Sequence, residues 1–385
     1  MNKRSFRIRT LTPIWTGGTD RDSNKVHETS IIGSLRWWYE GIIRGMGGNA
    51  CDPTNDPCPK DEKKPVRCSA CELFGCTGWS RKFRLEIRNI NAIPLFFVAN
   101  SNAYLANGNW LFRTFGGQDS GGGKTGKGLD TKFAFGVKNL WGEDPFDLMV
   151  TPLRGKGQDV IDIFSYLLRF VTTYGGIGAK TQNGFGQVKV VDGLNEESIE
   201  RGGILIQKDI KQKMVEHGVK KGLGSTFNIK NLFSNLYRIE TTQYLSSGRL
   251  IGEAPPNFDY RRHFIPCAFD VRYKSSAKNP FTGQGRDFGM RPFFIGRFKA
   301  KANSLLGETR GRSDQDRSAS KIHVSHLFYD SASQQYRLKV WGYVPEDLGV
   351  PLKDVEVAVN EFILQHMFPE SEIIQSYTKG DIKND

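Results

Sequence analysis

Five of the six cysteines lie in one stretch of the chain, between Cys51 and Cys76. Cys68 and Cys71 form a CxxC pair, and Cys51 with Cys58 can supply two further thiolates. In a reducing compartment such clusters bind zinc more often than they form disulfides. The sequence therefore predicts a structural zinc held by Cys51, Cys58, Cys68 and Cys71. Cys76 is a competing fourth ligand, because the gap between Cys51 and Cys58 is wider than usual, and metal-free reduced thiols are the alternative.

A glycine-rich segment at residues 175–190, GGIGAKTQNGFGQVKV, offers a second kind of chemistry. Glycine lets another backbone approach closely, and successive exposed N–H groups bind anions such as phosphate. The pattern favours a loop that faces nucleic acid, although the same glycines also suit a helix C-cap followed by a turn. The residues predicted to contact RNA in this loop are Gly176, Gly178, Lys180, Asn183, Gly184 and Gly186.

The sequence contains no convincing catalytic constellation. Its six histidines are scattered and match none of the common hydrolase or kinase motifs. His27, in a polar loop with Asp20 and Asp22, is a candidate for acid–base work on RNA, and a solvated loop histidine is the alternative. A GKT at residues 123–125 lacks the first glycine of a P-loop, since Gln118 stands there. We therefore expect a non-catalytic protein without a nucleotide cofactor.

The chain is basic: 385 residues include 54 Lys and Arg against 41 Asp and Glu, a formal net charge of +13. This excess favours a polyanionic partner, because Lys and Arg contacts to phosphates release counterions. No apolar run reaches the roughly 18 residues of a membrane span, and the N-terminus lacks a signal-peptide core. A cytoplasmic protein without a membrane partner is expected.

Hydrophobic periodicity predicts the elements that must position these residues. Strands are expected at 6–11, 81–90, 94–99 and 188–190, and helices at 31–46 and 160–171. The order strand, helix, strand, strand, helix, strand is that of a ferredoxin-like unit. Trp37 lies opposite the apolar stripe of the first helix, so it should meet another domain, a subunit or a base; a second packed face is the alternative.

A charged linker near residues 192–203 separates this unit from a second one. Beyond it we expect a strand at 264–273, a helix at 290–306, a hairpin at 322–329 and 336–343, an amphipathic helix at 355–368 and a frayed tail after Glu370. The predicted fold is α+β, with an N-terminal ferredoxin-like domain at 1–195 and a C-terminal one at 204–385. The cysteine-bearing insertion occupies about 49–80, and the glycine-rich loop 175–186.

Four stretches, in this order, resemble the RAMP superfamily of CRISPR-associated proteins: FRIRTLTPIWTGG, SIIGSLRWWYEGIIRGMGG, CSACELFGCTGWSRKFRLEI and GGIGAKTQNGFGQVKV. RSDQDRSASKIHV at 312–324 resembles the arginine-bearing segment of the second domain less specifically. The resemblance is closest to the first subunits of type III-B Cmr effector complexes. It implies two ferredoxin-like (RRM-like) domains with a charged cleft between them. It also implies binding of the 3′ part of a guide RNA, of target RNA, or both, with other Cmr subunits as partners and cleavage credited to those subunits.

Basic and aromatic residues elsewhere complete the predicted RNA interface, as phosphate contacts and stacking surfaces. They are Trp15, Arg36, Trp37, Arg44, Arg81, Lys82, Arg312, Arg317 and Lys321. Two other functions compete with RNA binding. One is a metal-independent endoribonuclease of the same superfamily that uses His27. The other is a scaffold that contacts only protein subunits, through Trp37 and apolar patches.

Overall fold

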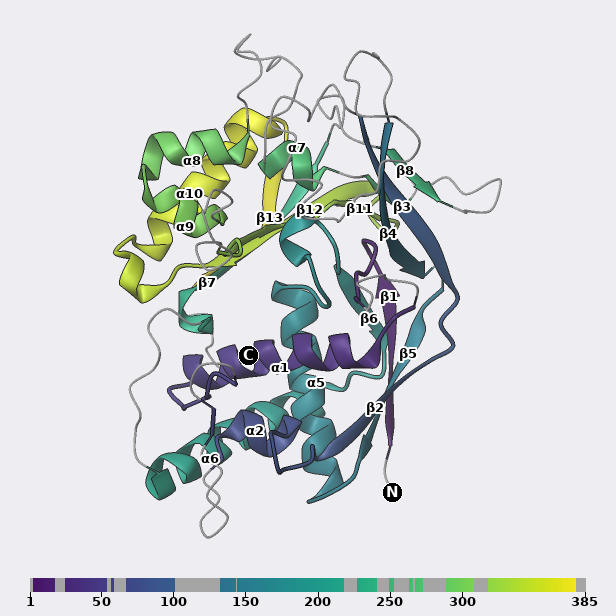
Figure 1. The fold of residues 1–385 in the computed structure, drawn as a ribbon, viewed down its shortest axis with the longest axis vertical. Coiled ribbons are helices and arrows are strands. Elements are labelled where there is room, and N and C mark those ends of the chain that lie inside the picture. The colour runs from purple at the N-terminus through teal and green to yellow at the C-terminus, as the bar shows by residue number, and fades with distance from the viewer. Residues whose placement is uncertain are drawn as a thin grey trace.

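The computed structural model describes residues 3–17, 25–53, 57–58, 67–100, 132–142, 144–217, 227–240, 249–252, 263–265, 267–272, 289–307 and 318–378. Two units, lower and upper in Figure 1, are each built on an antiparallel sheet. None of the helices formed by these residues is long and apolar enough to cross a membrane.

The sheet of the first unit contains β1 (Arg4–Thr10), β2 (Phe83–Arg88), β5 (Phe146–Pro152) and β6 (Val188–Asp192). Its order is β2-β5-β1-β6, with every pair antiparallel. Numbered along the chain, these core strands lie in the order 2-3-1-4, which confirms the ferredoxin-like unit. Alternation along β1 buries Phe6 and Ile8 and leaves Arg7 and Arg9 exposed on the other face.

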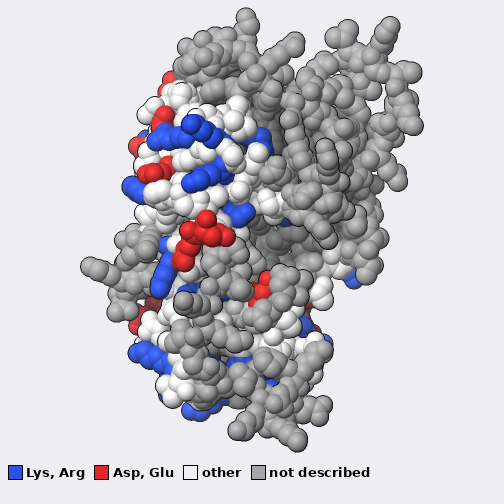
Figure 2. Space-filling view, turned by 60° about the vertical axis from the view of Figure 1, so that its left-hand side comes forward, with Lys and Arg blue, Asp and Glu red and all other residues white. Residues whose placement is uncertain are grey.

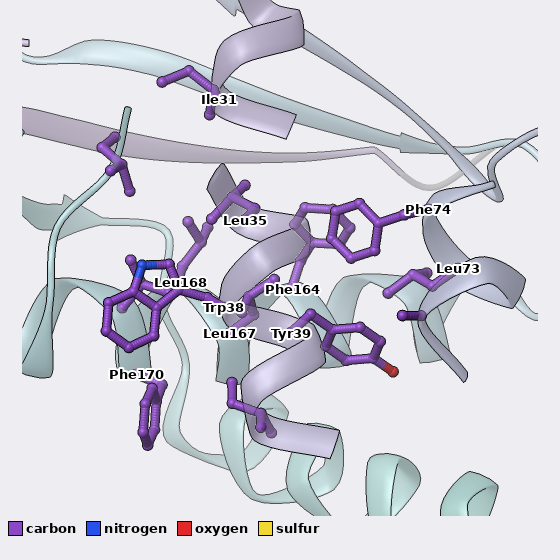
Figure 3. Packing of buried hydrophobic residues seen from close by; sticks show 14 of the residues in the cluster. Ile31, Leu35, Trp38, Tyr39, Leu73, Phe74, Phe164, Leu167, Leu168 and Phe170 are labelled. Atoms are coloured by element: carbon purple, nitrogen blue, oxygen red, sulfur yellow. The ribbon is translucent and has the colours of Figure 1, made fainter. Parts of the chain in front are cut away.

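Helices α1 (Glu28–Gly45) and α5 (Gly157–Tyr174) pack on the buried side of this sheet. Figure 3 shows Trp38 and Tyr39 of α1 among Phe164 and Leu168 of α5. Phe74 of α2 (Ser69–Phe74) closes the same cluster, with its ring 5.6 Å from that of Tyr39. The two predicted helices are therefore confirmed.

The predicted strand at 94–99 is not part of the ferredoxin-like sheet. It lies in β3 (Ala92–Asn100), which pairs with β4 (Lys132–Gly142) and β8 (Arg249–Gly252) in a separate three-stranded sheet at the upper right of Figure 1. The third core strand is β5, whose sequence FDLMVTP alternates between buried and half-buried residues.

A helix, α6 (Glu196–His217), replaces most of the predicted linker at 192–203. It packs on α5 of the first unit, where Arg201 Nε lies 2.9 Å from Asp162 Oδ2. The charged residues that suggested a linker form the exposed side of this helix, while Ile206 and Ile210 join the first core. Residues 204–217 thus lie against the first unit, although the sequence assigned them to the second.

The second unit repeats the topology. Its strands are β7 (Leu232–Ile239), β9 (Phe264–Ile265), β10 (Ile322–Val324), β11 (Leu327–Asp330), β12 (Gln335–Tyr343) and β13 (Glu372–Thr378). The order is β13-β7-β12-β11-β9, and β10 also pairs with β12. With β10 and β11 counted as one interrupted strand, this is again 4-1-3-2 followed by β9. The helices are α7 (Ala268–Arg272), α8 (Met290–Phe298), α9 (Lys301–Leu306) and α10 (Leu352–Glu361), the last extended by a π-helical turn at Phe362–Met367.

Two predictions for this unit are wrong. Residues 264–273 do not form one strand, because β9 ends at Ile265 and α7 begins at Ala268. The described part of the tail after Glu370 is not frayed: β13 pairs with β7, and Tyr377 buries its ring against the first core. Residues 379–385 lie outside the described residues. The hairpin and the 355–368 helix are confirmed. The 290–306 segment is helical but divides into α8 and α9, because the backbone turns at Lys299, which has a φ of +52°.

Candidate metal centre and nucleic-acid interface

The thiols of Cys51, Cys58, Cys68 and Cys71 lie together, with all four sulfur atoms within 4.8 Å of one another. Cys51 Sγ is 3.4 Å from Cys71 Sγ and 3.7 Å from Cys68 Sγ. A disulfide requires about 2.05 Å, whereas sulfurs around a tetrahedral zinc stand about 3.8 Å apart. The set therefore fits a metal ion, as predicted. Cys76 lies outside this group.

Short-range hydrogen bonds prepare these thiols for a metal. The backbone N–H of Cys68 donates to Cys58 Sγ at 3.3 Å, and that of Cys71 donates to Cys68 Sγ at 3.4 Å, which caps the start of α2. Hydrogen bonding with the Cys51 thiol lowers the pKa of Cys68, and it lowers that of Cys58 to about 7. The thiolate is the form that binds metals, so these bonds favour the ligating state of Cys58 and Cys68, whereas hydrogen bonding within the cluster raises the pKa of Cys51 and of Cys71.

Arg36, predicted to contact RNA, is turned inward onto the cluster. Its guanidinium donates to Cys71 Sγ at 3.2 Å, to the Gly75 carbonyl at 2.6 Å and to Glu40 Oε1 at 2.8 Å. A cation bonded to a ligand sulfur offsets the negative charge of a thiolate group and holds the ligand in place. In this structure Arg36 therefore supports the metal centre.

Arg44, predicted for the same role, is also turned inward, with its side chain 9% exposed. It donates to the carbonyls of Ala50, Cys51 and Phe227 at 3.1–3.2 Å and lies 3.7 Å from Glu40. These bonds tie the end of α1 both to the cysteine segment and to the chain that enters the second unit. Arg44 thus braces the fold instead of presenting its charge to a ligand.

The glycine-rich loop is a joint between the two units. Gly184 has a φ of +102°, and a Cβ there would stand 2.5 Å from the ring of His326 in the second unit. Gly186 has a φ of +79°, and its Cβ would stand 1.9 Å from the carbonyl oxygen of Ile177. Only glycine fits both the left-handed backbone and these approaches. The glycines do allow a close approach to the backbone, as predicted. At these positions, however, the approaching groups belong to the protein itself and not to RNA.

The first half of the loop packs on α1. Trp38 Nε1 donates to the Gly176 carbonyl at 3.0 Å, and a Cβ at Gly175 would collide with the Trp38 ring at 1.9 Å. The backbone N–H of Gly178 donates to Ser34 Oγ at 3.1 Å. The N–H of Gly178, one of the groups predicted to bind phosphate, is therefore already bonded within the protein.

The polar tip of the loop is also enclosed. Asn183 is 2% exposed, and Trp15 is 3% exposed with its ring edge against Phe185. Lys180 Nζ lies 4.0 Å from the centre of the Trp15 ring, and burial lowers its pKa to about 8. Trp15 and Asn183 therefore pack within the protein and offer no surface to a base or a phosphate in this structure.

From the second unit, Arg272 and His323 reach the same tip. Arg272 Nη1 donates to the Gln182 carbonyl at 2.8 Å, and His323 Nδ1 lies 2.9 Å from Thr181 Oγ1. The His323 ring stacks on Trp341 with a centroid separation of 3.7 Å. Where the resemblance implies a charged cleft between the domains, these described residues form a buried, hydrogen-bonded contact.

Lys339 completes the joint from β12. Its Nζ donates to the Thr172 carbonyl at the end of α5 at 2.9 Å, and burial lowers its pKa to about 7. Burial likewise lowers the pKa of His326 to about 3. The joint therefore favours the uncharged forms of both side chains.

Trp37 contacts the second unit. Contact with another domain was one of the three alternatives expected for this side chain. Its ring stacks on Phe227 at 3.9 Å and 6°, and it contacts the edge of Tyr343 at 6.2 Å. Gly41 makes room for Phe227, since a Cβ there would lie 2.2 Å from its ring. Gly41 and Gly45 lie one helical turn apart on one face of α1, and such spacing indicates a close contact with another segment. This signal was present in the sequence but was not used to predict the contact.

A surface missed by the sequence analysis lies on the exposed face of the first sheet. Arg9 of β1 and Lys189 of β6 are direct cross-strand partners, and both side chains are exposed. Like charges in this position repel each other. No ion pair is formed by either residue within the described part of the chain, whereas Arg7 lies 3.9 Å from Asp147. The alternation in FRIRT was the available signal.

Cations also gather over the second unit, in the upper part of Figure 2, with acidic side chains beside them. Arg297 pairs with Glu361 and Lys353 with Glu356, while Lys301 donates to the Gly349 carbonyl. This charge is therefore partly balanced within the protein.

The remaining predicted RNA contacts stay predictions. Arg81 and Lys82 immediately precede β2 and are half-buried. Lys321 donates to the Ser304 carbonyl at 2.8 Å, and burial lowers its pKa. Arg312 and Arg317 lie outside the described residues.

His27, the candidate base, precedes α1. Its backbone N–H donates to Thr16 Oγ1 at 3.1 Å, and its Nε2 is shielded from solvent without a partner in the described structure. Asp20 and Asp22 lie outside the described residues.

Comparison with known proteins identifies a protein family for the first unit. Residues 7–189 match the family model of the RAMP superfamily. This region belongs to the RAMP superfamily. No curated protein matches the chain. Among solved structures, the chain is similar to apo Cmr1 from Pyrococcus furiosus, at 12% identity and a TM-score of 0.43, over 90% of this chain and 88% of the other. It is also similar to a chain of the type III-B Cmr-beta complex bound to cognate target RNA, at 14% identity and a TM-score of 0.40, over 94% and 98% of the two chains.

The RAMP match runs from Arg7 in β1 to Lys189 in β6, so it covers nearly the whole first sheet. It therefore includes the four clustered cysteines and the glycine-rich joint. The second unit lies beyond the matched residues, and it shares only the strand order of the first unit.

Proposed function

We propose that this RAMP protein is a non-catalytic RNA-binding subunit of a type III-B CRISPR (Cmr) effector complex. It engages the 3′ part of the guide RNA, target RNA, or both, beside other Cmr subunits, in antiviral defence. The observation that carries RNA binding is the exposed pair Arg9 and Lys189 on the open face of the first sheet. A cross-strand pair of cations is unfavourable in the isolated chain and becomes favourable when a phosphate lies between them.

The family match and the overall charge support the same conclusion. The chain has an excess of 13 positive charges, and this face adds Arg7, Arg84 and Arg88, with side chains more than half exposed. These three arginines pair with carboxylates, so they contribute less free charge than Arg9 and Lys189. The face carries no aromatic cross-strand pair, so it suits contacts to phosphate more than stacking of bases.

Fluorescence anisotropy with a labelled single-stranded RNA over a series of salt concentrations tests this proposal. Arg9→Glu with Lys189→Glu is expected to reduce the slope of log K against log salt by about 1.4, for two lost phosphate contacts at about 0.7 each. The matched control, Arg297→Gln with Lys353→Gln on the second unit, should leave the slope unchanged. RNA binding that survives charge reversal unaltered would contradict the role of this face, whereas a wild type that binds no RNA would favour the scaffold hypothesis.

The shielded His27 Nε2 supports a non-catalytic protein, because a general base must reach the proton that it removes. Incubation of purified protein with RNA should leave the RNA intact. Cleavage by the wild type that disappears in His27→Ala would instead establish the endoribonuclease.

For the cysteine cluster we propose a structural zinc. Four thiolates suit zinc, and all four positions are taken by protein ligands, which leaves none open for a substrate. Cys51, Cys68 and Cys71 are nearly buried, at 8%, 8% and 1% exposure. The ion would join the segment after α1 to α2 and so hold the insertion on the RAMP sheet.

Metal analysis of the purified chain tests this assignment. The wild type is expected to carry about one zinc per chain, and Cys58→Ser should lose it. Cys76→Ser is the matched control and should retain the metal, because Cys76 lies outside the cluster. A metal-free wild type, or equal loss in both variants, would refute the assignment.

A further inference from the structure

A group of cations surrounds Trp79 at one corner of the first unit, beside the cysteine cluster. The Arg67 and Arg154 guanidinium carbons lie 3.5 and 4.4 Å from the centre of the Trp79 ring. Arg81 and Lys82 follow Trp79 along the chain after Ser80. We call Arg67, Trp79, Arg81, Lys82 and Arg154 the Trp79 corner.

A tight turn presents Trp79 at the surface. Cys76 and Trp79 exchange both backbone hydrogen bonds at 2.9 Å, and Gly78 at the tip has a φ of +78° with open space around it. Arg36 holds the residue that precedes this turn, because its guanidinium donates to the Gly75 carbonyl at 2.6 Å. The same guanidinium also donates to Sγ of the cluster ligand Cys71. Arg36 thus stabilises both the metal centre and the turn that carries Trp79.

The corner carries more positive charge than it neutralises. One carboxylate, Glu72, serves both Lys82 Nζ at 2.8 Å and Arg67 Nε at 3.2 Å. Arg81 and Arg154 donate to the backbone carbonyls of Phe83 and Ser80, which leaves their charge in place. Among the residues that the structure describes at this corner, four cations against this one carboxylate give a surplus of three.

Two donors at the corner lack an acceptor. Trp79 Nε1 and Arg154 Nε form no hydrogen bond in the described structure, although both are removed from solvent. Because both are shielded from solvent, as His27 Nε2 is, these two donors are not ligand contacts in this structure, and the surplus positive charge of the corner is what attracts a phosphate. Stacked guanidinium and indole planes also accept a nucleobase by stacking.

We propose that the Trp79 corner binds the phosphodiester backbone of single-stranded RNA, with one base stacked on the Arg–Trp planes. The proposal rests on the RNA-binding function proposed above and adds a second contact site to it. Arg84, two residues beyond Lys82 on β2, has a 63% exposed side chain. It links the corner to the open sheet face, so one strand of RNA can follow both surfaces.

The test uses the purified full chain and fluorescein-labelled oligouridine, measured by anisotropy over a salt series. Arg81→Gln with Arg154→Gln should reduce the slope of log K against log salt by about 1.4. Trp79→Leu should weaken binding about tenfold through lost stacking. The control Arg297→Gln with Lys353→Gln should change neither. Unaltered circular dichroism and zinc content establish that each variant is folded.

The outcomes separate this proposal from the one on which it rests. If the wild type binds RNA, and the Arg9 and Lys189 reversals weaken binding while the corner variants do not, the Trp79 corner is refuted and the RNA-binding function stands. If the wild type binds no RNA, the RNA-binding function fails, and the corner fails with it. If polyglutamate, and not oligouridine, binds in a manner sensitive to Arg81 and Arg154, the corner is a docking site for an acidic protein segment.

Discussion

Replacement of Lys339 by methionine tests how the two units are joined. Lys339 Nζ is enclosed between the units and donates to the Thr172 carbonyl at 2.9 Å. Burial lowers its pKa from 10.5 to about 7. Methionine has a similar length and no charge, so it keeps the packing and removes the titration.

The sign of the effect follows from proton linkage. Between the folded and unfolded pKa values, the unfolded chain binds a proton that the folded chain lacks, so the free energy of unfolding rises with pH. A difference of one bound proton between the unfolded and folded chain changes the free energy of unfolding by about 1.4 kcal/mol per pH unit. Between about pH 7.5 and 9.5, Lys339 should therefore contribute an increase of roughly 2–3 kcal/mol, which the methionine variant lacks.

Urea unfolding followed by tryptophan fluorescence, at several pH values, measures this difference. The quantity compared is the change of unfolding free energy with pH in the wild type minus that in Lys339→Met, so other titrating groups cancel. The exposed Lys208 of α6 provides the matched control, and Lys208→Met should keep the wild-type dependence. If Lys339→Met also keeps it, the amine is not held uncharged in the joint and the reasoning is refuted.

Two further predictions concern the joint and the metal centre. Gly184→Ala should destabilise the chain by about 2–4 kcal/mol, because its φ of +102° and the His326 ring at 2.5 Å both oppose a Cβ. Gly33→Ala, with open space around it in α1, should instead be neutral or stabilising by up to about 1 kcal/mol, and equal melting temperatures would contradict this account. Arg36→Met removes the donor to Cys71 Sγ and should weaken zinc binding about 10–100-fold in a chelator competition; unchanged affinity would show that the bond is incidental.

Local patterns were sufficient for much of the fold. The helical stripes that became α1 and α5, and the alternation in β1 and β2, reflect a preference of each segment to bury one face. Such preferences act over a few residues, so sequence alone can show them. The ligand set Cys51, Cys58, Cys68 and Cys71 was likewise readable, because few residue types bind zinc. The third core strand was misplaced because β3 and β5 carry the same kind of local signal, and only pairing partners distinguish them.

The sequence by itself determined two helices and three of the four core strands of the first unit, the cysteine ligands and the excess of positive charge. Only the tertiary structure decided which cations and glycines face outward. Arg36, Arg44 and the loop around Gly184 carry the composition of an RNA contact, yet their partners are a thiol, carbonyl groups and a histidine ring from distant parts of the chain. Charge and backbone freedom are local properties of a residue. Burial depends on what the rest of the chain brings against it, and for this reason the exposed pair Arg9 and Lys189 appeared only when β1 and β6 were seen side by side.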